Sequence, residues 1–256
     1  GVHRGLRGSP VYYMSIQFFL HFQVNGWFIF GISGLALHFI TKAGHGLRGR
    51  VWNQILMMLV VSTVLTYALA VSWSNPSPWV FAINSLGAFI QLVAIVLLLR
   101  ELAGLRKKAR ALVDPWVYGW IGFAFICLGL KVAIQTAVIL PPIAIIAYTI
   151  RNYVIGFLHL ILLGMLTHFL LAAGFREKLL DANNTLARVG MITFSAGFIL
   201  SETLLFLQGT LAWARLGMIP YFHHMLFVVS LLLPLGILLL VMYGVSRSFI
   251  TQSPKS

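Results

Sequence analysis

The fold is decided by a stretch in which a turn, an apolar run and a basic cluster follow one another. Residues 74–110 read SNPSPWVFAINSLGAFIQLVAIVLLLRELAGLRKKAR. The run from 79 to 100 holds no charge before Arg100, and its length suffices to cross a bilayer core, which takes about 20 helical residues. The prolines before it separate it from the preceding helix, because a residue followed by proline avoids the helical conformation. The sequence therefore predicts a transmembrane helix here.

Apolar segments of this length recur along the whole chain. Of its 256 residues, 60% are hydrophobic and 9% are charged, a composition that fits a protein embedded in a bilayer and excludes a water-soluble domain. We predict seven spans, at residues 12–40, 53–73, 79–100, 116–139, 150–174, 189–213 and 219–245. The stretch 143–149 is too short to span, so we expect an interfacial helix or an early start of the fifth span. The predicted fold is an all-α, polytopic transmembrane helix bundle forming one domain over residues 1–256.

The basic residues indicate how the spans are oriented. Thirteen of the eighteen Lys and Arg residues fall on one side of the predicted spans, four fall on the other, and Lys131 lies within a span. Because cytoplasmic loops retain Lys and Arg, we expect the N-terminus outside and the C-terminus in the cytoplasm. This distribution explains the net charge of +13 without a nucleic-acid partner.

Residue counts exclude several kinds of chemistry. Cys127 is the only cysteine, which rules out disulfides within the chain, thiolate metal clusters and the two-cysteine attachment of haem c. The sequence contains no phosphate-binding loop or zinc-protease helix motif. Of five carboxylates, only Glu202 is clearly inside a span, so a carboxylate-driven ion pump is poorly supported.

Ionisable side chains within the spans are the functional candidates, because they are costly in hydrocarbon. They are His21, His38, Lys131, His159, His168, Glu202, His223 and His224. With the predicted orientation, the outer half of the membrane holds His21, Lys131, His159, Glu202 and His223. We expect packing or interface roles for His38 and His224. On an unbroken helix, His168 lies on the face opposite to His159. Lys131 and Glu202 form either a structural ion pair or parts of a proton path.

Two strings could hold a cofactor. In His21-Phe22-Gln23-Val24-Asn25-Gly26-Trp27, His21 and Asn25 share a helix face, and Gly26 permits close approach of another helix or a flat ligand. Neutral imidazole is the usual haem ligand, and Asn25 could orient it. In the second string, Arg151 lies at the outer boundary about two turns before His159. Arg151 could bind an acidic group such as a haem propionate, or simply anchor the helix at the interface.

The string from His21 to Trp27 resembles histidine-rich helices in the catalytic subunit I superfamily of haem-copper oxidases and nitric oxide reductases. Members of this superfamily typically have twelve spans, and this chain would correspond to the last seven. The chain opens on Gly1 rather than Met, and we expect a fragment or processed form that lacks an N-terminal helical half. The resemblance implies that His21 is the metal-site histidine of the family's sixth helix and that His159 is a haem ligand of its tenth.

The chain also departs from the family pattern. The family's seventh helix carries an adjacent histidine pair for copper, whereas the corresponding span 53–73 contains no histidine. The pair His223-His224 is on the last span instead, which makes His223 a further candidate ligand for copper or another metal. The family's tenth helix carries two histidines at i and i+2, and here His159 has no such partner. Conventional oxygen reduction at a haem-copper centre is therefore not expected.

These features predict a subunit-I-like protein of the bacterial cytoplasmic membrane that binds haem. It would serve electron transfer or a divergent respiratory oxidoreductase reaction, alongside other respiratory-complex subunits. The alternative is a non-redox transporter or sensor whose outer polar layer forms a substrate pocket or proton relay. A structural subunit of a larger membrane complex is the third interpretation.

Overall fold

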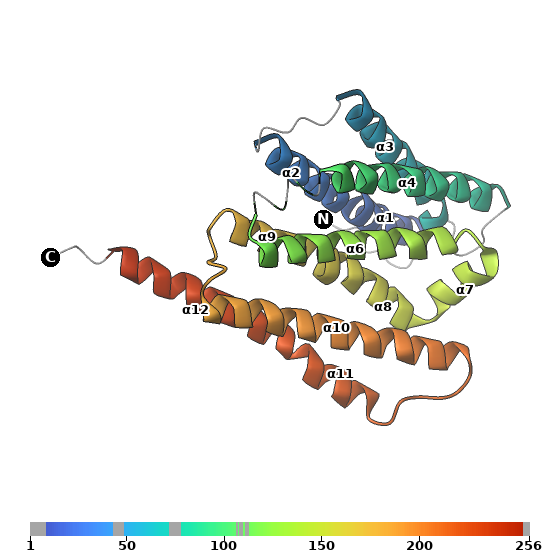
Figure 1. Ribbon diagram of the computed structural model, residues 1–256. Helices are drawn as coiled ribbons and strands as arrows, with labels where there is room; N and C mark the ends of the chain where they lie inside the picture. The colour runs from blue at the N-terminus through green and yellow to red at the C-terminus, as the bar shows by residue number, and fades with distance from the viewer. Residues whose placement is uncertain are drawn as a thin grey trace. The chain divides into compact units, whose positions relative to one another are not determined.

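The described part of the chain is built from helices, as the sequence predicts. The computed structural model describes residues 9–42, 49–71, 78–105, 107, 110 and 113–252, and within these ranges every regular element is helical (Figure 1). Seven of the helical runs are long and apolar enough to cross a membrane. They are Val11–Lys42, Gly49–Ala68, Pro78–Gly104, Pro115–Ala137, Arg151–Arg176, Thr185–Trp213 and Phe222–Ser246. The prediction of seven spans is confirmed, and their length and composition support an integral membrane protein.

The first and fifth spans are each composed of three consecutive segments. The first consists of α1 (Pro10–His21), η1 (Phe22–Trp27) and α2 (Phe28–Lys42), and the fifth of α8 (Arg151–His159), η2 (Leu160–Thr167) and α9 (His168–Arg176). The remaining long helices are α3 (Gly49–Val71), α4 (Pro78–Gly104), α6 (Pro115–Ala137), α10 (Thr185–Trp213), α11 (Phe222–Ser230) and α12 (Leu232–Gln252). The last two together make the seventh span.

Two predicted boundaries were placed too late. The second span begins at Gly49 rather than residue 53. The sixth begins at Thr185 rather than 189, because the side chain of Asn184 accepts hydrogen bonds from the backbone N–H groups of Leu186 and Ala187 and so caps the helix. The short apolar stretch before the fifth span forms a separate helix, α7 (Pro141–Thr149). Ile150 then adopts an extended conformation, which separates α7 from α8.

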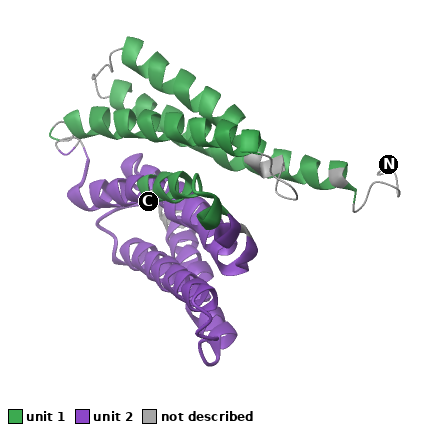
Figure 2. Cartoon of the chain, turned by 90° about the vertical axis from the view of Figure 1, so that its right-hand side faces the viewer, with its two compact units in different colours: residues 1–107, 129–144 green, residues 108–128, 145–256 purple. Residues whose placement is uncertain are grey.

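The chain divides into two compact units (Figure 2). Unit 1 comprises residues 1–107 and 129–144, and unit 2 comprises residues 108–128 and 145–256. Helix α6 is shared, since the division falls at residue 128. Each unit has its own packing contacts and its own buried polar groups, which are described separately below.

Unit 1 is held together by the pairing of α3 with α4. Gly87 of α4 is buried, and a β-carbon at this position would lie 2.7 Å from Cβ of Leu65 and 2.9 Å from the backbone nitrogen of Thr66. Only glycine permits this close approach of α4 to α3. Helix α1 packs on α3 through aromatic side chains, with the rings of Phe18 and Tyr67 5.5 Å apart.

Unit 2 has α10 at its centre, with α8 and α12 packed along it. A β-carbon at Gly236 of α12 would lie 2.7 Å from the carbonyl oxygen of Gly190, so the α10 and α12 backbones meet at these two glycines. Close to this contact, a buried apolar cluster joins α6, α9, α10 and α12. Its members are Val117, Ala172, Phe175, Ala187, Met191, Leu240 and Tyr243.

The first and fifth spans change from α- to π-helix directly after His21 and His159, respectively. Segment η1 follows His21, and η2 follows His159. The α-helical spacing assumed between His159 and His168 therefore does not apply, because a π-helix has more residues per turn than an α-helix. Two side chains donate hydrogen bonds to backbone carbonyls of η2. The hydroxyl of Thr167 donates to the carbonyl of Leu162, and Nδ1–H of His168 donates to the carbonyl of Leu163.

Candidate functional site

Unit 1 contains a buried polar cluster centred on Lys131 of α6. The Lys131 side chain is fully buried. Its ammonium group donates to Oδ1 of Asn25 at 2.6 Å and to Oε1 of Gln91 at 3.3 Å. Three segments that are distant in the sequence, η1, α4 and α6, therefore meet at one ionisable group. Such a group inside a membrane-spanning helix marks a functional site unless it serves packing alone.

A chain of hydrogen bonds continues from Asn25 to α3. Asn25 Nδ2 donates to Nδ1 of His21 at 3.4 Å, and Nε2–H of His21 donates to the carbonyl oxygen of Thr63 at 2.8 Å. Since a carbonyl only accepts, the proton of neutral His21 resides on Nε2 and Nδ1 is the acceptor. The hydroxyl of Thr63 in turn donates to the carbonyl of Asn25 at 3.3 Å. His21 and Asn25 thus lie together, as their spacing suggests.

Two features of the backbone place these groups. The π-helical segment η1 starts after His21 and contains Asn25, which remains within hydrogen-bond reach of the imidazole. On α4, Gln91 lies one turn after Gly87, and both belong to the buried face of the helix. The sequence analysis missed Gln91 and Thr63. The available signal was the position of Gln91 as a polar residue inside an otherwise apolar span.

Both ring nitrogens of His21 are engaged within the protein. Metal coordination by His21 requires a ring nitrogen with an available lone pair. In this arrangement Nε2–H is used on Thr63, and the Nδ1 lone pair is directed at Asn25. A metal at His21 would have to replace one of these hydrogen bonds. Metal ligation by His21 stays a prediction, and the observed geometry instead makes His21 the terminal member of the Lys131 cluster.

Unit 2 places His159 beside Glu202. Nδ1 of His159, the last residue of α8, lies 3.9 Å from Oε2 of Glu202 on α10, which exceeds a hydrogen-bond distance. Nδ1 of His159 and both carboxylate oxygens of Glu202 are buried and have no hydrogen-bond partner among the described residues. The His159 side chain is 33% exposed and that of Glu202 is 12% exposed. An imidazole edge therefore reaches the surface of the unit, while its other nitrogen faces a carboxylate.

Glycines allow α8 and α10 to bring this pair together. A β-carbon at Gly156, three residues before His159, would lie 3.0 Å from the Phe206 ring and 3.4 Å from Oε1 of Glu202. Further along the contact, the hydroxyls of Tyr153 and Thr210 lie 3.0 Å apart in a hydrogen bond. The helices are thus in close contact at Glu202 and along the part of α10 that follows it, which keeps its carboxylate next to the imidazole.

His168 occupies a different environment from His159. It is fully buried, and its ring is surrounded by four aromatic side chains, Trp120, Phe123, Phe194 and Phe198. Its Nδ1–H donates to the Leu163 carbonyl at 2.7 Å, and Nε2 lies 3.0 Å from the hydroxyl of Ser195. Both nitrogens of His168 are therefore used, and its contacts are those of a packing residue.

The other predicted site residues are not gathered into a site. Arg151 is exposed at the first position of α8, and His223 and His38 are also exposed. Among the residues that the structure describes, no three His, Cys, Asp or Glu side chains come close enough to hold a metal ion together. Lys131 and Glu202 belong to different units, and their predicted ion pair stays a prediction. Metal ligation by His223 likewise stays a prediction.

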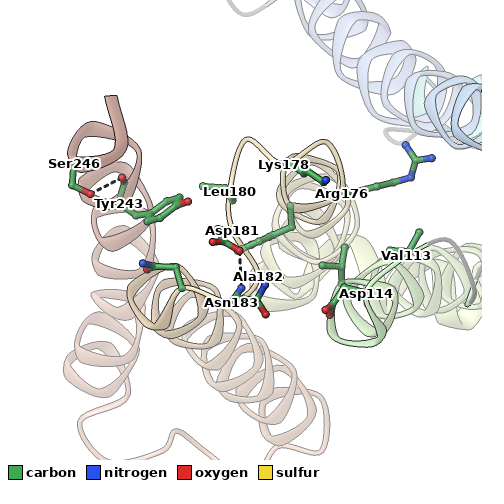
Figure 3. Close-up of a pocket in the computed structure, with 13 residues that line it drawn as sticks. Val113, Asp114, Arg176, Lys178, Leu180, Asp181, Ala182, Asn183, Tyr243 and Ser246 are labelled. Carbon is green, nitrogen blue, oxygen red and sulfur yellow. Dashed lines mark hydrogen bonds between the residues drawn. The ribbon is translucent and has the colours of Figure 1, made fainter. Parts of the chain in front are cut away.

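A pocket lies at the end of unit 2 where α9 ends and α10 begins (Figure 3). Its volume is about 750 Å³, and its lining combines apolar side chains such as Phe175 and Tyr243 with charged ones. The carboxylate of Asp114 accepts from the backbone nitrogen of Trp116, and that of Asp181 accepts from the backbone nitrogen of Asn183. These carboxylates therefore stabilise the chain turns, and the pocket contains no predicted site residue.

Comparison with known proteins gives no family assignment. The chain matches no protein-family model, no curated protein and no solved structure.

Proposed function

We propose that the protein binds haem through His159 and serves electron transfer in a membrane. The observation that carries this proposal is the state of the His159 ring, which makes no hydrogen bond among the described residues and faces Glu202 through Nδ1. A metal-bound histidine typically uses one nitrogen on the metal and directs the other N–H to a carboxylate or carbonyl. His159 has a carboxylate beside Nδ1 and makes no hydrogen bond among the described residues, whereas both ring nitrogens of His21 and His168 are engaged.

The residues around His159 would fit one haem ligand. His159 would present Nε2 to the iron, while Nδ1–H points toward Glu202, whose carboxylate would hold the ring in one orientation and increase its basicity. Gly156 permits the α8–α10 contact that supplies this carboxylate. Arg151, two turns before His159 on α8, would pair with an acidic group of the cofactor near the membrane boundary. Bound haem supplies one-electron chemistry.

The orientation and location belong to the same proposal. The excess of Lys and Arg on one side of the spans supports an N-terminus outside and a C-terminus in the cytoplasm. The resemblance to the subunit I superfamily agrees with a haem ligand at His159, and the missing histidine pair in α3 argues against conventional oxygen reduction. The proposed setting is a bacterial cytoplasmic membrane with other respiratory subunits as partners.

An optical spectrum tests the proposal directly. Full-length protein extracted from membranes is expected to show a Soret band, and His159→Ala is expected to remove or shift it. His38→Ala is the matched control, because His38 is exposed and should leave the band unchanged. A wild-type protein that is folded but has no Soret band would overturn the haem proposal.

The buried Lys131 cluster favours a second candidate function, a non-redox transporter or sensor. Fully buried ionisable groups in membrane helices often line substrate or proton pathways, and Lys131 is such a group. In this case Lys131→Met would abolish substrate uptake or proton flux in proteoliposomes, whereas His159→Ala would not. If His159→Ala abolished the flux and Lys131→Met did not, the result would contradict this second function.

A further inference from the structure

When Lys131 is protonated, unit 1 offers no neighbouring counter-charge for it. The chain has five Asp and Glu residues, and only Glu101 falls within residues 1–107 and 129–144. Glu101 follows Gln91 by ten residues on α4, or about 15 Å along the helix axis. The two groups that Lys131 contacts, Asn25 and Gln91, are neutral amides. A buried ammonium surrounded only by dipoles is unfavourable in a membrane.

Hydrogen-bond donors are in excess beside this charge. An ammonium has three N–H donors, and the described residues supply two acceptors to Lys131. Gln91 is only 1% exposed, yet its Nε2 has no hydrogen-bond partner. The unpartnered oxygen of Gln135, one turn along α6, makes no hydrogen bond to Lys131. Nε2 of Gln91 belongs to the same amide as the oxygen that accepts from Lys131. The N–H groups of Gln91 and of Lys131 that have no acceptor are therefore next to each other.

We propose that Lys131 and Gln91 bind a small monovalent inorganic anion, such as chloride, inside unit 1. The anion neutralises the ammonium and accepts hydrogen bonds from the third N–H of Lys131 and from Nε2 of Gln91. Asn25 holds the ammonium in place from the opposite helix segment and is itself oriented by His21. The site involves neither His159 nor Glu202, so it is independent of the haem proposal.

Replacing chloride by gluconate at constant ionic strength tests the site in the purified full-length protein. Chloride is expected to raise the Tm by about 5 °C at a hundredfold excess over its Kd. Equilibrium dialysis with radioactive chloride is expected to find close to one bound anion per chain. Lys131→Met should lose both effects, while His38→Ala keeps them. A wild-type protein with no bound chloride and no chloride-dependent Tm would overturn the proposal.

Gln91→Glu gives a sharper test, because it supplies a carboxylate at the same position with almost the same side-chain volume. This variant is expected to bind no chloride, and its Tm in gluconate should reach that of the wild type in saturating chloride. The matched control is Asn84→Asp, which adds a carboxylate two turns earlier on the buried face of α4. Asn84→Asp should have a lower Tm and still bind chloride. Where Lys131→Met does not fold, retained chloride binding in Gln91→Glu still contradicts the proposal.

An ion pair with Glu202 is the competing source of negative charge. Such a pair would leave the wild type without bound chloride, and the effects of Lys131→Met and Glu202→Gln on the Tm would not add. That combination would overturn the anion site. Additive effects together with one bound chloride per wild-type chain would support it.

Discussion

Lys131 Nζ and Asn25 Oδ1 are joined by a hydrogen bond of 2.6 Å across 106 residues of sequence. Asn25 simultaneously faces His21, so one amide connects a lysine on α6 with a histidine at the end of α1. A charged donor with an amide acceptor in a buried setting is stronger than a neutral pair. This relationship makes Asn25 the residue on which the polar cluster of unit 1 depends.

Asn25→Leu should therefore destabilise the protein markedly. The change removes an acceptor from a buried ammonium, and breaking such a contact costs about 3 kcal/mol. The free energy of unfolding in detergent micelles is the measurement. Asn25→Asp keeps an acceptor and adds a negative charge, so it should recover the loss. A stability for Asn25→Leu equal to that of His38→Ala would show that the hydrogen bond is unimportant.

Gly87→Ala tests the close packing of α3 on α4. A β-carbon there would meet Cβ of Leu65 at 2.7 Å and the Thr66 backbone nitrogen at 2.9 Å, and such overpacking costs about 1–3 kcal/mol. Gly34→Ala is the control within unit 1, since a β-carbon at Gly34 meets nothing within 4 Å. Alanine favours a helix over glycine, so the control should be neutral or slightly stabilising. Equal thermal stability of the two variants would refute the close contact.

His168→Ala should lower stability without affecting a cofactor. It would leave a cavity among four aromatic rings and remove the hydrogen bonds to Leu163 and Ser195, a loss of about 3 kcal/mol. Thr167→Val removes only one hydroxyl hydrogen bond and should cost about 1 kcal/mol. Thermal unfolding gives the stability, and the optical spectrum should match the wild type. Loss of the Soret band in His168→Ala would instead identify His168 as a ligand.

Glu202→Gln tests the orienting role of the carboxylate beside His159, and it rests on the haem proposal. Removing the negative charge makes the imidazole a weaker electron donor, so the reduction potential should rise while the Soret band persists. Redox titration of the purified protein is the measurement. Thr203→Val, on the exposed face of α10, is the control and should leave the potential unchanged. A potential insensitive to Glu202→Gln would remove Glu202 from the site.

The local features of the fold could be predicted from the sequence. The span Pro78–Gly104 begins at the last proline of the predicted turn, whose other residues lie outside the described ranges, and it contains the whole predicted run 79–100. Backbone groups in a bilayer must satisfy one another within a helix. The pairing of His21 with Asn25 was also indicated by their spacing. The late boundary at Thr185 arose because hydropathy locates the apolar run, whereas Asn184 determines where the first turn starts.

The candidate site was only partly predictable, since it depends on which helices meet. The composition flagged Lys131, His159 and Glu202 as costly in a membrane, but it did not show that Lys131 contacts Asn25 and Gln91, or that Glu202 faces His159. The π-helical segments after His21 and His159 were also missed. In a π-helix, each backbone hydrogen bond joins residues five apart rather than the four of an α-helix. The hydropathy of the residues does not depend on this difference.

The sequence by itself determined the number of spans and the identity of the ionisable residues within them, because both follow from the free energy of placing residues in hydrocarbon. Only the tertiary structure decided the partners of those residues. Gly87 permits the close approach of α4 to α3, and Gly156 permits that of α8 to α10, while Gln91 meets Lys131 and Glu202 meets His159. Such contacts arise from packing between helices, and the hydrophobic pattern of a single helix specifies its buried stripe without specifying the neighbour that covers it.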